Sequence, residues 1–272
     1  MSNTPSLSPL DSSYVLTREQ TDRYKKDGHI LLRNVASRQE IDLYRHRVQK
    51  IVLQSVARRD TQGRIEEYSS LFLQVTNVWR LDDTLRNFIF AKRFARIAAE
   101  LMGVHGVRLY HDQALFKPAG GKATPWHQDQ FYWPLETNHT ITMWMPLIDV
   151  SQQMGTMSFA SGSHQDGPLV DVSISEKSHE LFEHLIVGRS FATESYELQA
   201  GDATFHSGWT VHSTHANSSS QVREVITIIY YADGTLLLEP DNEFRKADMQ
   251  VFHPGQKPGE LAATPLNPLL YP

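Results

Sequence analysis

Residues 126–129 read Trp-His-Gln-Asp, and far downstream they are followed by His212-Ser213-Thr214 and by Arg223. A histidine and a carboxylate separated by one residue lie on the same face of a β-strand, because strand side chains alternate with period two. His127 and Asp129 have this spacing. One more histidine from a distant strand would complete a set of two histidines and one carboxylate. Such a set can hold iron(II) on one side and leave other coordination positions open.

The second histidine of this set has three candidates, which are His206, His212 and His215. In a strand over 209–214, His212 and Thr214 share one face, and His215 lies on the other. Arg223 begins the next apolar run, so a hairpin can return it beside the same pocket. Its guanidinium is suited to gripping a carboxylate with two hydrogen bonds. We therefore favour His212 as the ligand, and expect His206 and His215 to be surface or outer polar residues.

The amino-acid composition argues against several classes of partner and of active site. The 272 residues are 40% hydrophobic and 21% charged, which is ordinary for a globular protein with a sizeable core. A net charge of −5 and the lack of a basic run argue against nucleic acid or an anionic membrane as partner. The absence of cysteine excludes disulfides, thiolate metal sites and cysteine nucleophiles. The polar first residues and the short apolar runs favour a cytoplasmic protein without a membrane span.

Helical patterns come first along the chain, and β patterns follow. We expect a flexible lead-in over residues 1–16, and then one domain over 17–272. Its parts are a helical region to about residue 103, a β core over about 104–235, and an irregular tail. Within the helical region, capping boxes and apolar spacing predict helices over 18–27, from residue 38 onward, and over 83–102, with a polar loop over 60–68.

Short alternating runs divided by Gly, Pro and Asp predict the strands of the β core. They cover 107–116, 140–150, 155–160, 194–199, 202–206, 209–214 and 223–231. The polar stretch 165–192 is expected to form an insertion that arches over one mouth of the barrel.

These motifs resemble the phytanoyl-CoA dioxygenase family of iron(II)/2-oxoglutarate oxygenases. The resemblance covers about residues 18–232 and rests on the order and spacing of short motifs. They are the segment 24–35, Phe116-Lys117-Pro118, Trp126-His127-Gln128-Asp129, Trp144-Met145-Pro146-Leu147, Gly155-Thr156-Met157, Gly162-Ser163-His164, Gly201-Asp202, and His212-Ser213-Thr214 with Arg223.

The resemblance implies a mainly β fold with flanking helices. That fold is a double-stranded β-helix, a jelly-roll or cupin-like barrel, preceded by N-terminal helices. It also implies that His127, Asp129 and His212 are the catalytic iron(II) ligands. Arg223 and Thr214 match the positions that hold the far carboxylate of the cosubstrate 2-oxoglutarate. Positions that often line the cosubstrate or substrate pocket are matched by Gln113, Lys117 and Trp144.

The reaction implied is the oxidation of a small-molecule metabolite by dioxygen, while 2-oxoglutarate is decarboxylated to succinate. Because Asp129 is present, hydroxylation or another oxidation is favoured over halogenation, for which related enzymes replace this carboxylate. Phe131 and Trp133 share the face of Asp129 if the strand continues regularly. The candidate substrate-binding residues are Gln74, Phe131, Trp133 and Trp209.

Three other functions stay open at this point. One is an acyl-CoA hydroxylase of the same family, although the β half has few Lys and Arg residues for the phosphates of CoA. The others are a non-catalytic cupin-like binding protein and a cupin-like isomerase with another metal, such as zinc. Neither needs Arg223 and Thr214 at this spacing. The pattern specifies neither the substrate nor the oligomeric state.

Overall fold

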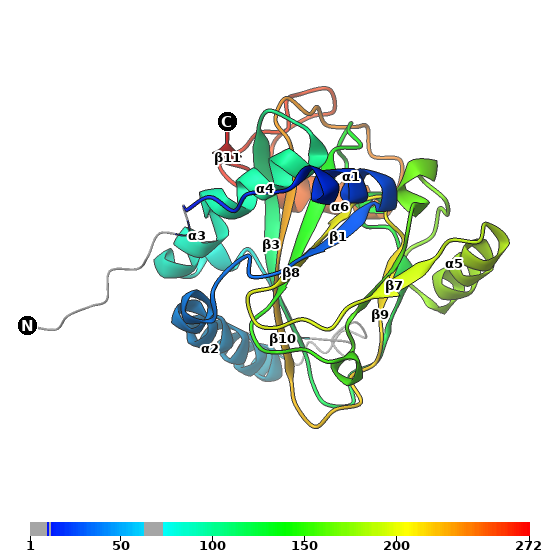
Figure 1. Ribbon diagram of the computed structural model, residues 1–272. Coiled ribbons are helices and arrows are strands. Elements are labelled where there is room, and N and C mark those ends of the chain that lie inside the picture. The colour runs from blue at the N-terminus through cyan, green and yellow to red at the C-terminus, as the bar shows by residue number, and fades with distance from the viewer. Residues whose placement is uncertain (1–9, 11, 63–72) are drawn as a thin grey trace, which may run out of the picture.

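Two antiparallel β-sheets with helices on their outer sides make up the protein (Figure 1). The computed structural model describes residues 10, 12–62 and 73–272. In this part of the chain, no helix has the length and apolar character needed to cross a membrane. The expected loop over 60–68 lies mostly outside the described residues, and its first three residues extend a helix.

The larger sheet has seven strands, in the order β1-β8-β5-β10-β3-β11, with β2 also paired to β3. Their bounds are β1 His29–Leu32, β2 Leu73–Thr76, β3 Val107–Lys117, β5 Thr140–Pro146, β8 Ala203–Ser207, β10 Arg223–Ala232 and β11 Leu269–Tyr271. The smaller sheet has the order β4-β9-β6-β7. It consists of β4 Thr124–His127, β6 Met157–Ala160, β7 Thr193–Ser195 and β9 His212–Thr214.

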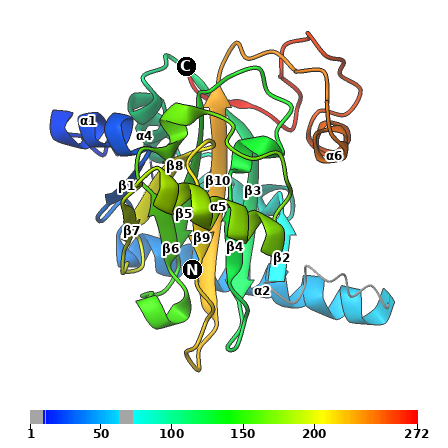
Figure 2. The ribbon, with the colours of Figure 1, turned by 90° about the vertical axis from the view of Figure 1, so that its right-hand side faces the viewer.

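The two sheets face each other across a cavity that residues of both sheets line (Figure 2). The side chains of β10 alternate between the two faces of its sheet. Thr227 and Ile229 line the cavity, whereas Ile226 and Ile228 join the hydrophobic core on the outer face. The jelly-roll fold is therefore confirmed, with sheets that do not close into a continuous barrel in the described part of the chain.

Four helices contribute to the main hydrophobic core, which lies against the outer face of the larger sheet (Figure 1). They are α1 Arg18–Asp27, α2 Arg38–Gln62, α3 Asp83–Ile89 and α4 Lys92–Met102. The capping box predicted for α1 is present, with Thr17 and Gln20 bonded reciprocally and Gly28 ending the helix at φ 78°. Two residues of the expected flexible lead-in contact the rest of the protein, because Leu10 is buried and Ser12 accepts hydrogen bonds from Arg93.

The single helix expected over 83–102 is wrong, because the chain forms α3 and α4 with a break at Phe90 and Ala91. The buried residues of α3 (Leu85, Phe88, Ile89) and those of α4 (Phe94, Ile97, Leu101) would point to opposite sides of one straight helix. The break lets both apolar stripes face the same core. Periodicity within each half predicts a helix, but it does not reveal this change of phase.

The insertion and the tail also differ from expectation. Residues 165–192 include helix α5 (Glu176–Gly188), which packs on β4 at the outside of the smaller sheet (Figure 2). Phe182 and Ile186 cover Trp126 there, so this helix is not a lid over the barrel mouth. The tail, expected to be irregular, contains helix α6 (Glu243–Phe252), capped by the Asn242 side chain. The described residues also form short 3₁₀ helices, which are η2 Val78–Arg80, η3 Asp129–Phe131, η4 Gln152–Met154 and η5 Ser163–Asp166.

Candidate active site

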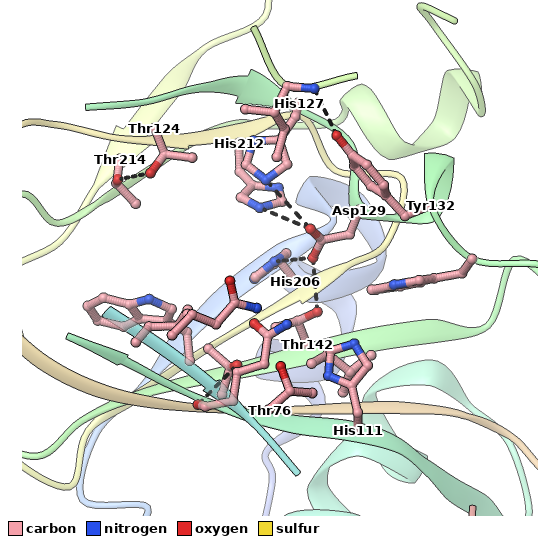
Figure 3. A pocket seen from close by; sticks show the side chains of 18 of the residues that line it. Thr76, His111, Thr124, His127, Asp129, Tyr132, Thr142, His206, His212 and Thr214 are labelled. Atoms are coloured by element: carbon pink, nitrogen blue, oxygen red, sulfur yellow. Dashed lines mark hydrogen bonds and ion pairs between the residues drawn. The ribbon is translucent and has the colours of Figure 1, made fainter. Parts of the chain in front are cut away.

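Two histidines and one aspartate converge at the edge of the smaller sheet (Figure 3). His127 ends β4, His212 begins β9, and the two are direct register partners with ring centroids 4.1 Å apart. The Nε2 atom of each histidine lies 3.6 Å from Oδ1 of Asp129. The three ligand atoms all lie within 4.8 Å of one another, which is the convergence that one metal ion requires.

Asp129 reaches this position from outside the strand. β4 ends at His127, Gln128 keeps an extended backbone (φ −120°, ψ 126°), and Asp129 starts η3. His127 and Asp129 therefore still point to the same side, as the period of two predicts. The Gln128 side chain points elsewhere, and it donates hydrogen bonds to the carbonyl oxygens of Gly167 and Trp209. The expectation of a regular strand through Asp129 is wrong. The expectation that His127 and Asp129 point to the same side is right.

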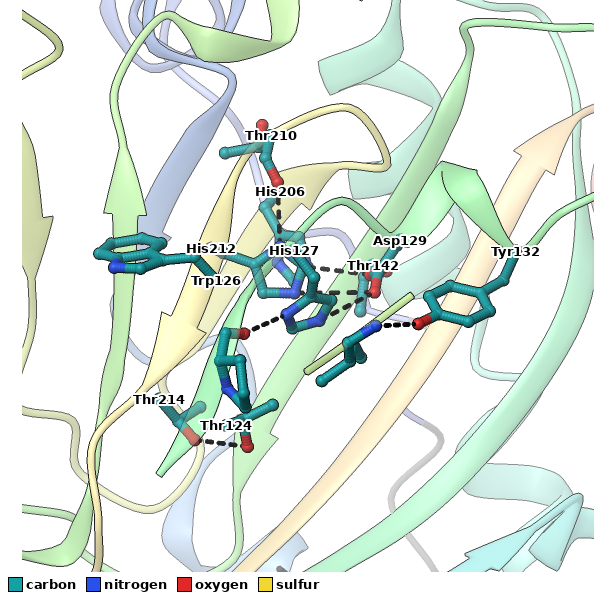
Figure 4. Close-up of polar contacts among 12 residues, drawn as sticks. Thr124, Trp126, His127, Asp129, Tyr132, Thr142, His206, Thr210, His212 and Thr214 are labelled. Atoms are coloured by element: carbon teal, nitrogen blue, oxygen red, sulfur yellow. Dashed lines mark hydrogen bonds and ion pairs between the residues drawn. The ribbon is translucent and has the colours of Figure 1, made fainter. Parts of the chain in front are cut away.

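Backbone carbonyl groups fix the tautomer of both histidines (Figure 4). Nδ1 of His127 lies 2.7 Å from the carbonyl oxygen of Pro125, and Nδ1 of His212 lies 2.9 Å from that of Thr210. A carbonyl oxygen can only accept, so each Nδ1 carries the proton and each Nε2 presents its lone pair to the centre of the triad. Both rings are thus held in the form that binds a metal ion.

The second oxygen of Asp129 has partners of its own (Figure 4). Thr142 Oγ1 donates to Oδ2 at 3.1 Å, and His206 Nε2 lies 3.3 Å from the same atom. Burial alone would raise the pKa of Asp129, but the surrounding histidines hold it well below its ordinary value. His206, from β8, is therefore a buried residue that orients the carboxylate, and a surface position for it is excluded. His215 is exposed, as expected, and bonds Ser158.

Two buried cations lie side by side on the larger sheet. Arg223 of β10 and Lys117 of β3 are register partners with exposed fractions of 2% and 0%. Lys117 Nζ donates to Thr214 Oγ1 at 2.7 Å and to the carbonyl oxygen of His215 at 3.0 Å. Arg223 donates to the Gly155 carbonyl, and its Nε has no partner among the described residues.

The charges of these two side chains are not compensated by protein. No Asp or Glu in the described part of the chain forms an ion pair with Lys117 or Arg223. Burial, and then the charge of Arg223, lower the pKa of Lys117 to about 7, and burial lowers the pKa of Arg223 to about 9. Burying unpaired charge costs several kcal/mol per group. An anionic ligand between them would remove that cost, and the guanidinium stacked 5.4 Å from the Trp144 ring is well placed to bind it.

The triad and Arg223 open into one cavity of about 460 Å³. Thr124 and Thr214 lie on one side of the triad, and Tyr132 and His111 lie on the other (Figure 3). The cavity therefore has a cationic end near Thr214 and a second end near His111. Nine of the residues singled out from the sequence line it: His127, Asp129, His212, Thr214, Arg223, Gln113, Trp144, Gln74 and Trp133.

Three of the residues expected in the pocket do not line the cavity, which are Phe131, Trp209 and Lys117, and Lys117 lies behind the lining residue Thr214, to which it donates. The 3₁₀ turn of η3 redirects Phe131, which packs against Tyr132 with ring centroids 5.0 Å apart. The Trp209 side chain donates to Asn138 at 3.0 Å, in the turn before β9. The expectation for Phe131 assumed a regular strand at a position where the chain turns.

Sequence reasoning missed the walls at the second end of the cavity. Helix α6 contributes Phe244, Asp248 and Phe252, which are spaced four residues apart and so share a face. That spacing, with Asn242 as a helix-capping residue, is the signal that could have revealed an amphipathic helix in the tail. The remaining missed lining residues are Thr76, His111, Leu115, Thr124, Tyr132, Thr142, Met157, Ile174, His206, Thr227 and Ile229.

A family model described as phytanoyl-CoA dioxygenase (PhyH) matches residues 24–225. The chain belongs to the phytanoyl-CoA dioxygenase family. This match spans the triad, Lys117 and Arg223, so the resemblance seen in the sequence motifs is confirmed, and with it the assignment to a class of dioxygenase enzymes.

Curated relatives of this phytanoyl-CoA dioxygenase family member include enzymes with different names. A probable alpha-ketoglutarate-dependent hypophosphite dioxygenase of Stutzerimonas stutzeri is 25% identical over 225 residues, which are 79% of this chain and 78% of the relative. An L-proline trans-4-hydroxylase of Streptomyces griseoviridis is 25% identical, covering 76% of this chain and 84% of the relative. The human peroxisomal phytanoyl-CoA dioxygenase is 22% identical, covering 80% and 69%.

Solved structures share the fold. The non-heme alpha ketoglutarate dependent carbocyclase SnoK from nogalamycin biosynthesis superposes with a TM-score of 0.75 at 23% identity, covering 93% of this chain and 96% of the other. EctD from S. alaskensis, solved with 2-oxoglutarate and 5-hydroxyectoine, gives a TM-score of 0.69 at 18% identity, covering 88% of each chain. These neighbours differ in the reactions that their names state, so the fold leaves the substrate open.

Proposed function

We propose that the protein is an iron(II)- and 2-oxoglutarate-dependent dioxygenase that hydroxylates a small-molecule metabolite. The observation that carries the proposal is one cavity lined by a facial metal-ligand triad and by the buried Arg223, with the buried Lys117 bonded to the lining residue Thr214 and no acidic partner for either cation among the described residues. The triad suits iron(II), and the cations suit a dicarboxylate cosubstrate. The relatives named as alpha-ketoglutarate-dependent or hydroxylating enzymes support the same assignment.

In this proposal His127, Asp129 and His212 hold the iron through Nε2, Oδ1 and Nε2. Bound iron(II) supplies the activation of dioxygen that couples decarboxylation of 2-oxoglutarate to oxidation of the substrate. The protein orients the metal ligands. Thr142 and His206 occupy Oδ2 of Asp129 and leave Oδ1 directed toward the two histidines. A carboxylate oriented in this way would present one oxygen to a bound metal ion.

The cationic end of the cavity would bind the far carboxylate of 2-oxoglutarate. Arg223 would offer its planar fork, and Lys117 would act through its charge and through Thr214. Trp144 and Gln113 line the same cavity and limit the orientation of the cosubstrate. A cosubstrate that is held at both ends stays in one position while the reaction takes place, and water is excluded from the space that it fills.

The cavity does not favour the alternatives left open by the sequence. Arg223 is the only Lys or Arg among its described lining residues, so no cationic cluster meets the phosphates of an acyl-CoA. A binding protein or isomerase that used only the metal would have no use for two buried, unpaired cations. A cytoplasmic location remains our expectation from the sequence.

Anaerobic titration with iron(II) and then 2-oxoglutarate tests the proposal. A weak visible metal-to-ligand charge-transfer band is expected only when both are bound to the same centre. A His212→Ala variant, which lacks one proposed ligand, should give no band. Stoichiometric iron binding by the unchanged chain without any band at saturating 2-oxoglutarate would rule the cosubstrate out.

The affinity for 2-oxoglutarate is expected to fall as the pH rises above about 7. Lys117 has a pKa of about 7 in the free protein, and a bound carboxylate favours its protonated form and raises that pKa. Above pH 7 binding therefore requires proton uptake, and the affinity drops by up to about tenfold per pH unit. Titrations followed by the charge-transfer band between pH 6.5 and pH 8.5 measure this slope.

A Lys117→Met variant provides the matched comparison, because it keeps a long side chain without a titrating group. Its affinity should be lower at pH 6.5 and nearly independent of pH over the same range. An equal slope in both proteins would assign the titration to another group and remove Lys117 from the cosubstrate site.

A further inference from the structure

The second end of the cavity is formed by aromatic rings around one carboxyl group. Helix α6 places Asp248 between Phe244 and Phe252 on the face that lines the cavity. Phe252 stacks on His111 with ring centroids 4.4 Å apart, and Phe244 lies 5.4 Å from Tyr132. His111 and Tyr132 lie on the side of the triad opposite Thr214 (Figure 3), so this acidic end is separate from the cationic end.

Asp248 has a hydrogen-bond donor but no counter-charge. Its Oδ2 accepts from the hydroxyl of Tyr110, a fully buried residue of β3, at 2.8 Å. Within the described residues it forms no ion pair, because the nearby Arg245 bonds both carboxylate oxygens of Asp241 and the Gln130 carbonyl. Burial raises the pKa of Asp248 to about 7, and the Tyr110 hydrogen bond offsets only part of this shift.

The histidines beside this carboxyl group do not supply a positive charge either. Burial lowers the pKa of His111 to about 3, and it lowers the pKa of His253, whose ring lies 5.8 Å from that of Tyr110, to about 4. Both rings are neutral at physiological pH. Among the described residues that line this end of the cavity, Asp248 is thus the one that carries a formal charge when ionised, and the nearby Arg245 does not line the cavity and is paired with Asp241.

We propose that this acidic end binds a positively charged nitrogen of the substrate, so that the enzyme acts on an amine. A cation beside Asp248 would compensate a carboxylate that is otherwise costly to bury. The faces of Tyr132, Trp133, Phe244 and Phe252 would add cation–π attraction and contact with an apolar body. An anionic substrate would be repelled here. The inference rests on the proposed function, and it adds the class of substrate.

The acidic end would fix the position of the substrate relative to the metal-ligand triad. The triad lies between the two ends of the cavity, with the cosubstrate proposed at one end and the amine at the other. An ammonium group held by Asp248 would orient the carbon skeleton toward the metal centre, and so select which C–H bond is oxidised.

Binding of a matched pair of probes tests the proposal. Phenethylamine, a cation at neutral pH, is compared with the neutral 2-phenylethanol by calorimetry on the full chain, both as isolated and loaded anaerobically with iron(II) and 2-oxoglutarate. The amine is expected to bind at least about tenfold more tightly than the alcohol. Equal affinities, or no binding of either probe at millimolar concentration, would overturn the proposal.

Two variants test whether Asp248 causes the preference for the amine. Asp248→Asn should remove the preference for the amine, whereas Glu243→Gln removes an exposed negative charge from the same helix and should keep it. A preference that survives in Asp248→Asn would overturn the proposal.

If that variant does not fold, the comparison of the two probes on the unchanged chain decides alone. A charge-transfer band without amine preference refutes only this inference, and amine preference without the band refutes only the proposed cosubstrate.

Discussion

Replacement of Asp129 by alanine is expected to abolish 2-oxoglutarate-dependent turnover. The change removes the only carboxylate of the triad, and it leaves Thr142 and His206 directed at the space where Oδ2 was. Iron(II) affinity should fall by at least about a hundredfold, because loss of a ligand exceeds the effect of losing an outer contact. Succinate formation and iron content after dialysis measure the two effects.

Two surface variants serve as controls for this prediction. Asp171→Ala removes an exposed aspartate outside the cavity, and His215→Ala removes the exposed histidine that follows β9. Both should keep stoichiometric iron and unchanged succinate formation. Turnover retained in Asp129→Ala would exclude this triad as the metal centre, and iron lost in His215→Ala would overturn the choice of His212 as ligand.

Substitution of Arg223 by methionine should raise the dissociation constant of 2-oxoglutarate by at least about tenfold, because breaking a buried charge pair costs a few kcal/mol. Methionine preserves much of the volume under Trp144 but removes the charge and the fork of donors. Iron(II) should still bind, since Arg223 bonds the Gly155 carbonyl and makes no hydrogen bond or ion pair with the described residues of the triad. The charge-transfer titration measures the constant.

The exposed Arg189, which pairs with Asp166, provides the matched arginine control. Arg189→Met should titrate like the unchanged chain. If Arg223→Met also titrates like the unchanged chain, the arginine that binds the cosubstrate lies elsewhere in the sequence. Loss of iron in Arg223→Met would show a general disturbance of the cavity, and the result would then contradict a role confined to the cosubstrate.

Much of the site could be predicted because its residues are set by short-range rules. The spacing of His127 and Asp129 survives the end of β4, since Gln128 keeps an extended backbone. The predicted hairpin after His212 is wrong, because β9 and β10 lie in different sheets, but the loop between them does bring Arg223 to the same cavity. Motif order then identified the family, which the match over residues 24–225 confirms.

Residues near a turn were predicted less well. Phe131 was assigned to the cavity on the assumption of a continuous strand and Trp209 without an argument from position, and both lie where the chain turns away. His206 was expected to be a surface or outer polar residue, because only His212 formed a coherent set with Thr214 and Arg223. It reaches Asp129 from β8, a strand of the other sheet, and only the facing of the two sheets brings them together.

By itself, the sequence determined the strand pattern, the capped helices, the metal-ligand spacing and the family, because each depends on residues close together or on ordered motifs. The tertiary structure alone decided which faces meet. It broke the expected helix over 83–102 so that two stripes share one core, and it folded α6 from the tail onto the cavity. It also left Lys117 and Arg223 buried, and Asp248 half-buried, without counter-charges among the described residues, since burial and pairing depend on contacts between segments far apart in the chain.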